Sequence, residues 1–80
     1  MKDSDWRILY ELHKTSNLTK TANLLFMTQP TLTKRLKQME TEWGCTIVDR
    51  TPKGLTFTAE GNFLATQAEK YLDLFRLHLF

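Results

Sequence analysis

A stretch of polar and basic side chains at positions 29–38 is the part of this 80-residue sequence best suited to binding a ligand. Lys34, Arg35 and Lys37 are cationic, and no acidic residue occurs in this stretch before Glu40. Cations bind phosphates, while amide and hydroxyl groups hydrogen-bond to base edges in the major groove of DNA. The composition therefore favours a nucleic-acid-binding surface over an ordinary solvated helix face. The amide and hydroxyl groups of the stretch belong to Gln29, Thr31, Thr33 and Gln38.

Other kinds of functional site find little support in the sequence. Cys45 is the single cysteine, which excludes an intramolecular disulfide and a cysteine-rich zinc site. His13 and His78 lie far apart in the chain, with no cysteine or carboxylate at metal-ligand spacing. Neither a Ser/His/Asp or Cys/His arrangement nor a glycine-rich phosphate loop is visible. We therefore expect no enzymatic activity, no metal and no cofactor.

The hydropathy pattern predicts a cytoplasmic protein. The first five residues lead into no apolar run, so the N-terminus does not resemble a secretory signal. Nothing in the sequence approaches the 18 or so consecutive apolar residues of a membrane-spanning helix. We therefore expect no association with a membrane.

The positive charge is concentrated in the middle of the chain. The net charge is only +2, from 11 basic and 9 acidic residues, which by itself does not imply a nucleic-acid partner. Between Lys20 and Lys53, however, six basic residues stand against three acidic ones. From Gly54 onward the balance reverses to two against three. The weak net charge therefore conceals a basic segment.

Helical periodicity predicts three helices, at about 4–14, 18–25 and 29–42. Ser4, Asn17 and Thr28 are placed to cap their N-termini, and Gly44 to end the third helix. Pro30 falls in the first turn of that helix, where its missing N–H is tolerated. The expected core residues are Trp6, Leu9, Leu12, Leu25, Leu32, Leu36, Met39 and Trp43.

A β-hairpin and a long helix are predicted to follow. Ile47 and Val48 favour a strand, residues 52–54 a turn and residues 55–57 a second strand. A short helix, a brief turn and a capped polar helix form a helix-turn-helix, in which the second helix reads bases near its N-terminus. The predicted fold is mainly α, a winged helix-turn-helix of three helices and a hairpin wing at 1–57, followed by a linker helix at 58–80.

The motifs of these elements resemble those of LysR-type transcriptional regulators. The resemblance is carried by residues 17–22, Leu25, the run 28–33 and the run 55–61, and the spacing holds without a gap from about residue 5 to residue 64. It implies sequence-specific DNA binding by a bacterial regulator, with helix 29–42 in the major groove and wing 46–57 at the minor groove or the phosphates. The positions that it implies, together with outward-facing cations, are Thr19, Lys20, Thr28, Gln29, Pro30, Thr31, Thr33, Lys34, Lys37, Arg50 and Lys53.

Three of these residues have alternative roles. Thr28 could be a helix cap alone. Arg50 could pair with Asp49 or Glu40 and so hold the fold instead of contacting DNA. Lys53, in the turn of the predicted hairpin, could be a solvated charge.

The last helix carries an apolar stripe that suggests a dimer. The resemblance implies that this linker helix packs against its copy in a second chain, with a tetramer possible in a full-length protein. An alternative is that the helix covers its own domain, which accounts for its first half but poorly for residues 72–80. The resemblance also implies that the effector-binding domain, which would bind a small-molecule inducer, is absent here, as expected of a truncated chain. The stripe consists of Leu64, Ala68, Tyr71, Leu72, Phe75 and Leu79.

Two other functions remain open at this stage. One keeps the fold and assigns the chain to the DNA-binding domain of a molybdate-responsive regulator. The other is a winged-helix module that binds proteins and not DNA. Such modules usually lose the basic residues of the third helix, whereas this chain keeps Lys34, Arg35 and Lys37.

Overall fold

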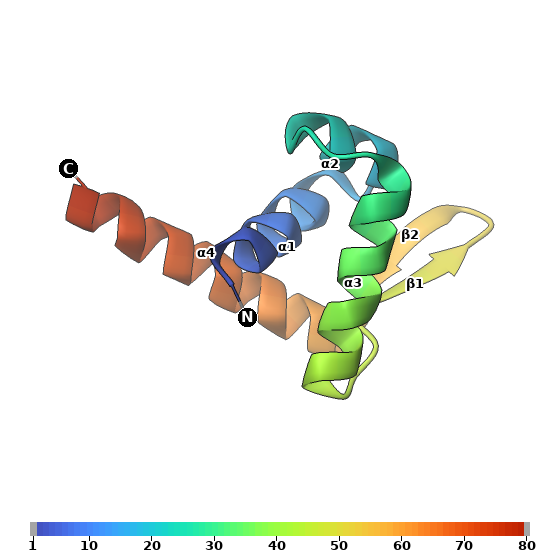
Figure 1. Cartoon of the computed structure of the whole chain (residues 1–80). Coiled ribbons are helices and arrows are strands. Elements are labelled where there is room, and N and C mark those ends of the chain that lie inside the picture. The colour runs from blue at the N-terminus through green and yellow to red at the C-terminus, as the bar shows by residue number, and fades with distance from the viewer. Residues whose placement is uncertain (1, 80) are drawn as a thin grey trace.

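Helices form most of the molecule, with one antiparallel hairpin between the third and fourth (Figure 1). The computed structural model describes residues 2–79, and the side chains of residues 2–73. The elements in order are α1 (Asp3–Thr15), α2 (Leu18–Leu24), α3 (Gln29–Trp43), β1 (Val48–Thr51), β2 (Gly54–Phe57) and α4 (Ala59–Leu79). The predicted winged helix-turn-helix with a long final helix is confirmed.

Local capping groups fix most of the helix ends. The Asn17 side chain accepts a hydrogen bond from the Lys20 N–H at 2.9 Å, and Thr28 accepts one from the Thr31 N–H at 3.3 Å. Gly44 ends α3 with a φ of 68°, in the left-handed region where glycine is favoured. The prediction that Ser4 caps α1 is wrong. The N-cap is Lys2, because the Asp5 carboxylate accepts the Lys2 N–H at 3.3 Å and the helix begins earlier.

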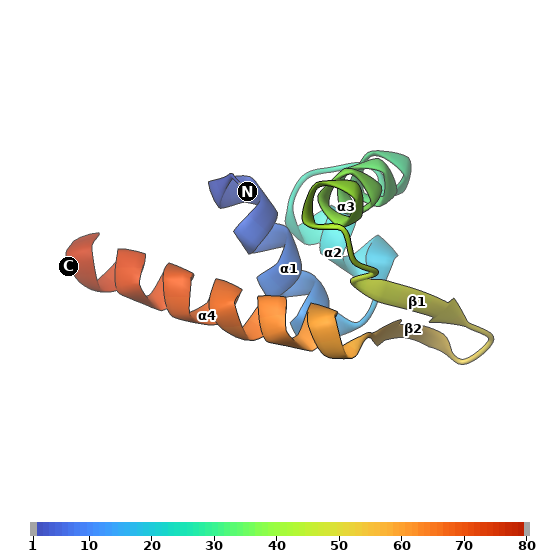
Figure 2. The ribbon, with the colours of Figure 1, turned by 90° about the horizontal axis from the view of Figure 1, so that it is seen from below.

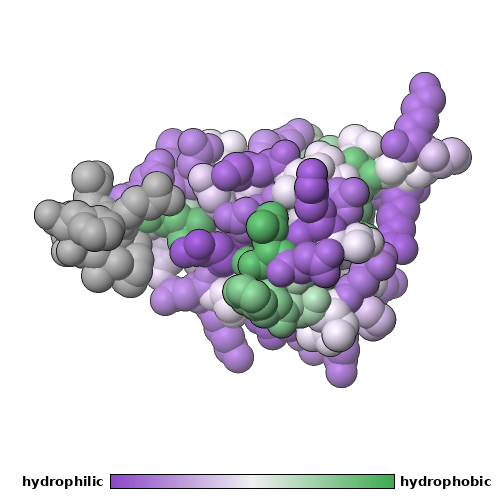
Figure 3. Space-filling view, turned by 90° about the horizontal axis from the view of Figure 1, so that it is seen from above, coloured by the Kyte–Doolittle hydropathy of each residue, from purple (hydrophilic) through white to green (hydrophobic). Residues whose placement is uncertain are grey.

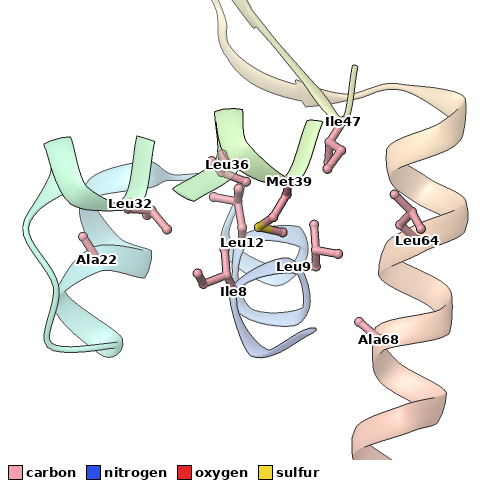
Figure 4. Packing of buried hydrophobic residues seen from close by; sticks show 10 residues of the cluster. All are labelled: Ile8, Leu9, Leu12, Ala22, Leu32, Leu36, Met39, Ile47, Leu64 and Ala68. Atoms are coloured by element: carbon pink, nitrogen blue, oxygen red, sulfur yellow. The ribbon is translucent and has the colours of Figure 1, made fainter. Parts of the chain in front are cut away.

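The core lies where α1, α3 and α4 meet, with Ala22 of α2 at one side (Figure 4). The prediction that Trp43 belongs to the core is wrong. Its side chain is 43% exposed because it is the last residue of α3, and its ring touches the half-buried Trp6 edge-on. Leu25 is also only half-buried. The buried cluster is Ile8, Leu9, Leu12, Ala22, Leu32, Leu36, Met39, Ile47, Leu64 and Ala68.

The hairpin projects from the helices as a wing (Figure 2). Its strands pair in a register that runs from Val48 opposite Phe57 to Thr51 opposite Gly54. Ile47, expected in the first strand, instead precedes β1 and is fully buried in the core. The Glu40 carboxylate accepts the N–H of Ile47 at 2.7 Å and that of Val48 at 3.3 Å. The base of the wing is thus attached to α3.

Helix α4 begins against the base of the wing and then runs along α1. Thr58 donates its hydroxyl to the Ile47 carbonyl at 3.2 Å and accepts the Gly61 N–H at 3.0 Å. A Cβ atom at Gly61 would lie 2.0 Å from the Ile47 carbonyl oxygen. Only a residue without a side chain allows α4 to approach this closely.

The apolar stripe of α4 faces the chain's own core over much of its length. Leu64, Ala68 and Leu72 are buried, and Figure 4 shows the first two pointing toward α1. These three residues are therefore corrected from a dimerisation surface to core positions, because a buried side chain offers nothing to a second copy. Phe75 and Leu79 lie outside the described side chains.

Tyr71 joins α4 to the start of α1. Its hydroxyl donates to the Asp3 carboxylate, and this hydrogen bond raises the pKa of Tyr71 above its ordinary value. Its ring centroid lies 5.7 Å from that of Trp6. Tyr71 is half-buried in this contact, so only part of its side chain is open to a second copy.

Candidate nucleic-acid interface

The outer face of α3 and the wing together line an open groove of about 850 Å³. A helical step of about 100° per residue places most of the α3 side chains in this groove away from the buried Leu32 and Leu36, whereas Gln29 reaches it from the first turn of the helix. Most of them are exposed. The groove therefore brings together six residues predicted to bind DNA with three others from the C-terminal half of α3. The lining residues are Gln29, Pro30, Thr33, Lys34, Lys37, Gln38, Thr41, Glu42 and Arg50.

Gln29 lies where the N-terminal ends of α2 and α3 meet. Thr19 of α2 donates its hydroxyl to Gln29 Oε1 at 3.3 Å, and both side chains are exposed. Lys20, the next residue in α2, is also exposed. The predicted contacts of α2 and α3 thus form one continuous surface.

Thr28 is a helix cap, as predicted, and its hydroxyl is engaged within the chain. It accepts the Thr31 N–H and donates to Thr31 Oγ1 at 2.8 Å. Thr31 is exposed on the first turn of α3. Of the two threonines, Thr31 retains its own hydroxyl proton for a ligand, since its oxygen accepts from Thr28.

Arg50 bridges the wing and α3. Its Nη2 donates to Thr33 Oγ1 at 3.2 Å, and neither of the alternative partners accepts this guanidinium. The Glu40 carboxylate instead binds backbone amides at the base of β1. Arg50 is exposed, so its charge faces the groove.

Arg35 is a cation that the sequence analysis counted with the binding surface but that has a different partner. Its guanidinium forms an ion pair with Asp5 of α1, whose side chain is only 3% exposed. Its Nη1 also donates to Gln38 Oε1 at 3.3 Å. Periodicity alone could not have indicated this partner, because Asp5 belongs to another helix. Arg35 lies about 60° around the helix from Leu32 and about 100° from Leu36, at the flank of the buried face.

Lys53 lies in the turn between β1 and β2, at the end of the wing. Its side chain is exposed, and no ion pair holds it among the residues that the structure describes. The same is true of Lys34 and Lys37 on α3. These three ammonium groups are therefore available to phosphates.

Within the described part of the chain, other kinds of site find no geometric support. No group of three or more histidine, cysteine or carboxylate side chains could hold a metal ion. No described helix combines the length and apolar character needed to cross a bilayer. The groove between α3 and the wing is therefore the strongest candidate site among the described residues.

Comparison with known proteins identifies the family. Residues 4–62 match the family model for bacterial regulatory helix-turn-helix proteins of the lysR family. The chain belongs to the LysR family. This membership overturns the alternative of a molybdate-responsive regulator.

The curated LysR-type relatives are transcriptional regulators and not enzymes. The uncharacterized HTH-type transcriptional regulator YraN of Bacillus subtilis is 43% identical over 73 residues, which are 91% of this chain and 25% of the relative. The regulator CitR of the same organism is 38% identical over 60 residues, 75% of this chain and 21% of the relative. The chain thus spans about a quarter of the length of the curated relatives it matches.

Solved structures of LysR-type proteins share the whole fold. The BenM DNA-binding domain in complex with catB site 1 DNA superposes with a TM-score of 0.92 at 25% identity, covering 99% of this chain and 89% of that one. Full-length OxyR from Pseudomonas aeruginosa gives a TM-score of 0.86 at 26% identity, covering 95% of this chain and 26% of that one.

Proposed function

We propose that this LysR-type domain binds double-stranded DNA sequence-specifically, with α3 in the major groove and the wing at the minor groove or the flanking phosphates. The observation that carries the proposal is the groove between α3 and the wing. It gathers exposed cations with the amide and hydroxyl groups of Gln29 and Thr33. Cations of this kind hold phosphates, and the polar groups can hydrogen-bond to base edges.

The residues divide into two roles. Gln29, Pro30, Thr33 and Lys34 lie along the outer face of α3 and would meet base edges or the nearest phosphates. Thr19, Lys20 and Thr28 would lie along the backbone on one side of this helix, and Arg50 and Lys53 on the wing side. Thr31 and Lys37 are exposed on α3 and extend the same surface.

Selection of bound sequences from random duplex DNA tests the proposal. We expect enrichment of one motif, followed by a gel shift of that motif in about 150 mM salt with excess nonspecific competitor. A chain that enriches no motif and gives no shift would instead be a protein-interaction module, the alternative that remains from the sequence.

We also propose that two copies bind one operator, paired through α4. The support is the exposed face of this helix, where the Phe63 side chain is 63% exposed, and the apolar sequence that follows Asp73. Helix α4 extends well beyond α1, which leaves room for a second copy (Figure 1). A twofold symmetric motif in the selected DNA is the expected consequence.

In the cell, we propose that this domain serves a longer cytoplasmic regulator of transcription. The relatives it matches are about four times its length. A second domain of such a regulator would bind a small-molecule inducer, and a tetramer could form through that domain. Linking induction to DNA binding requires the longer protein, so the isolated chain should bind its operator without an inducer.

A further inference from the structure

The polar side chains of the α3 outer face have their oxygen atoms occupied by donors from within the chain. Gln38 Oε1 accepts from Arg35 Nη1 at 3.3 Å, and Thr33 Oγ1 accepts from Arg50 Nη2 at 3.2 Å. A guanidinium can only donate. These two contacts therefore fix which atom of each side chain is engaged.

The same arrangement occurs at the N-terminal end of α3. Gln29 Oε1 accepts from the Thr19 hydroxyl, and Thr31 Oγ1 accepts from the Thr28 hydroxyl. Thr28 is the donor in that pair, and its oxygen in turn accepts the Thr31 N–H. In four polar side chains over about three turns of α3, the oxygen thus accepts a hydrogen bond from within the chain.

Each of these oxygens already accepts one hydrogen bond and keeps one lone pair, whereas a set of hydrogen-bond donors is left entirely unengaged by these contacts. These donors are the Nε2 amides of Gln29 and Gln38, the hydroxyl protons of Thr31 and Thr33, and beside them the ammonium groups of Lys34 and Lys37. Beyond Gln38 the pattern reverses, and an acceptor oxygen is left unengaged. Thr41 donates its hydroxyl to the Lys37 carbonyl at 3.0 Å, which leaves its oxygen, and Glu42 adds a carboxylate to the groove.

We propose that residues 29–38 of α3 form a donor face, which reads the acceptors N7 and O6 of guanine, N7 of adenine and O4 of thymine. Thr19, Arg35 and Arg50 then act as positioning residues that engage the oxygens of this face. The proposal rests on the proposed DNA binding. A glutamine that reads adenine by two hydrogen bonds uses both its amide nitrogen and its oxygen. Here the Gln29 oxygen already accepts from Thr19, which orients the carboxamide and leaves only one lone pair, so the donor face disfavours that mode.

Thr19 allows a direct test, because it touches Gln29 from another helix. Random duplexes are selected with the unmodified chain and with Thr19→Val, Thr19→Ser and Thr66→Val. Thr66 is an exposed threonine on α4 whose hydroxyl bonds within its own helix, so Thr66→Val is the matched control. In Thr19→Val the hydrogen bond to Gln29 Oε1 is lost, so the carboxamide can rotate and present both its oxygen and its nitrogen to adenine. We expect adenine to become accepted at one position of each half-site, enriched about threefold to tenfold, while Thr19→Ser and Thr66→Val keep the original preference.

A second test removes single hydrogen-bond acceptors from the bases of the selected DNA. Each purine of the selected motif is replaced in turn by its 7-deaza analogue, which lacks N7, and each thymine by 5-methyl-2-pyrimidinone, which lacks O4. We expect at least two positions in each half-site to lose about threefold to tenfold in affinity.

The outcomes separate the two proposals. If the unmodified chain selects a motif but Thr19→Val has the same preference at every position, or no acceptor removal weakens binding, the donor face is wrong and DNA binding stands. If the unmodified chain selects no motif, both proposals fail.

Discussion

Arg35 illustrates what sequence can and cannot determine at the scale of the residue. Helical periodicity correctly assigned the outward side of α3 to Thr33, Lys34 and Lys37, because a 100° step depends only on the helix itself. It could not assign Arg35, which pairs with Asp5, a residue 30 positions away on α1. Whether a cation at the flank of a helix forms an ion pair or stays available to a ligand depends on which side chains the neighbouring helix places beside it. That neighbour is invisible to a local pattern.

Gln29→Ala is expected to weaken binding to the selected operator by about 1–3 kcal/mol and to relax base preference. Truncation removes the amide that Thr19 holds at the N-terminal end of α3. Fluorescence anisotropy with operator and scrambled duplexes measures both effects, with Thr66→Ala on α4 as the control. Undiminished discrimination between the two duplexes would contradict a base-reading role.

Phe26→Gly is expected to stabilise the fold by about 1 kcal/mol. Phe26 has a φ of 56° in the turn before α3 and is 97% exposed, so glycine relieves strain there and loses no burial. Leu24 of α2 is also exposed, and the molecule seen from above carries an apolar patch on its surface (Figure 3). Urea unfolding measures the change.

The control for Phe26→Gly is Phe63→Gly, at an exposed position inside α4. Glycine there is expected to lower the free energy of unfolding by about 0.5 kcal/mol, since glycine has a lower helix propensity than phenylalanine. A loss of stability in both variants would show that Phe26 makes a contact that outweighs its backbone strain.

At the scale of the element, sequence performed best where the signals are local. Asn17, Thr28 and Gly44 mark helix ends through bonds to residues within four positions, and all three were predicted. The sequence predicted the first residue of β1 less well, since β1 begins one residue after Ile47. Ile47 has a strand-forming side chain, but Glu40 of α3 holds its N–H and the core takes its side chain. A long-range contact thus decides where the wing begins.

Lys53→Ala is expected to weaken binding to all duplexes alike and to reduce the slope of log affinity against log salt by about 1. Lys53 is an exposed cation at the end of the wing, where it can neutralise a phosphate without reading a base. Anisotropy titrations over a range of salt concentrations measure the slope. Lys70→Ala, an exposed lysine on α4, should leave it unchanged. An unaltered slope in Lys53→Ala would remove this residue from the interface.

Gly61→Ala is expected to destabilise the fold by about 1–3 kcal/mol, although alanine normally favours a helix over glycine. The added Cβ would collide with the Ile47 carbonyl and separate α4 from the base of the wing. Denaturant unfolding measures this. Thr66→Ala, at an exposed position of the same helix, should cause no loss. Stabilisation of Gly61→Ala would mean that the wing and α4 move apart freely.

At the scale of the whole molecule, α4 departs most from the sequence-based expectation. Its stripe of Leu64, Ala68 and Leu72 was assigned to a second copy because the helix is long and apolar. The structure gives these residues to the chain's own core. Amphipathic periodicity identifies a face that must be covered, but it contains no information on whether the cover comes from the same chain.

Phe63→Asp is expected to give a monomer where the unmodified chain is a dimer, measured by light scattering at about 50 µM. A carboxylate at this exposed position of α4 would have to be desolvated in the proposed interface. Phe26→Asp changes a second largely exposed phenylalanine, in the turn before α3, and should remain dimeric. A monomeric unmodified chain would contradict the dimer, and dissociation of Phe26→Asp alone would move the interface to the other face.

The burial of α4 against α1 also has a mechanical consequence. The helix shares a core with α1 and α3, and the first turn of α1 is bonded to α3 through Asp5 and to α4 through Asp3. Helices α4 and α3 are therefore expected to move together as one rigid unit. If two copies join along α4, a small change in their crossing angle would swing both α3 helices without any repacking inside either copy. The distance between the two half-sites that the dimer can bind would then depend on how the α4 helices of the two copies cross.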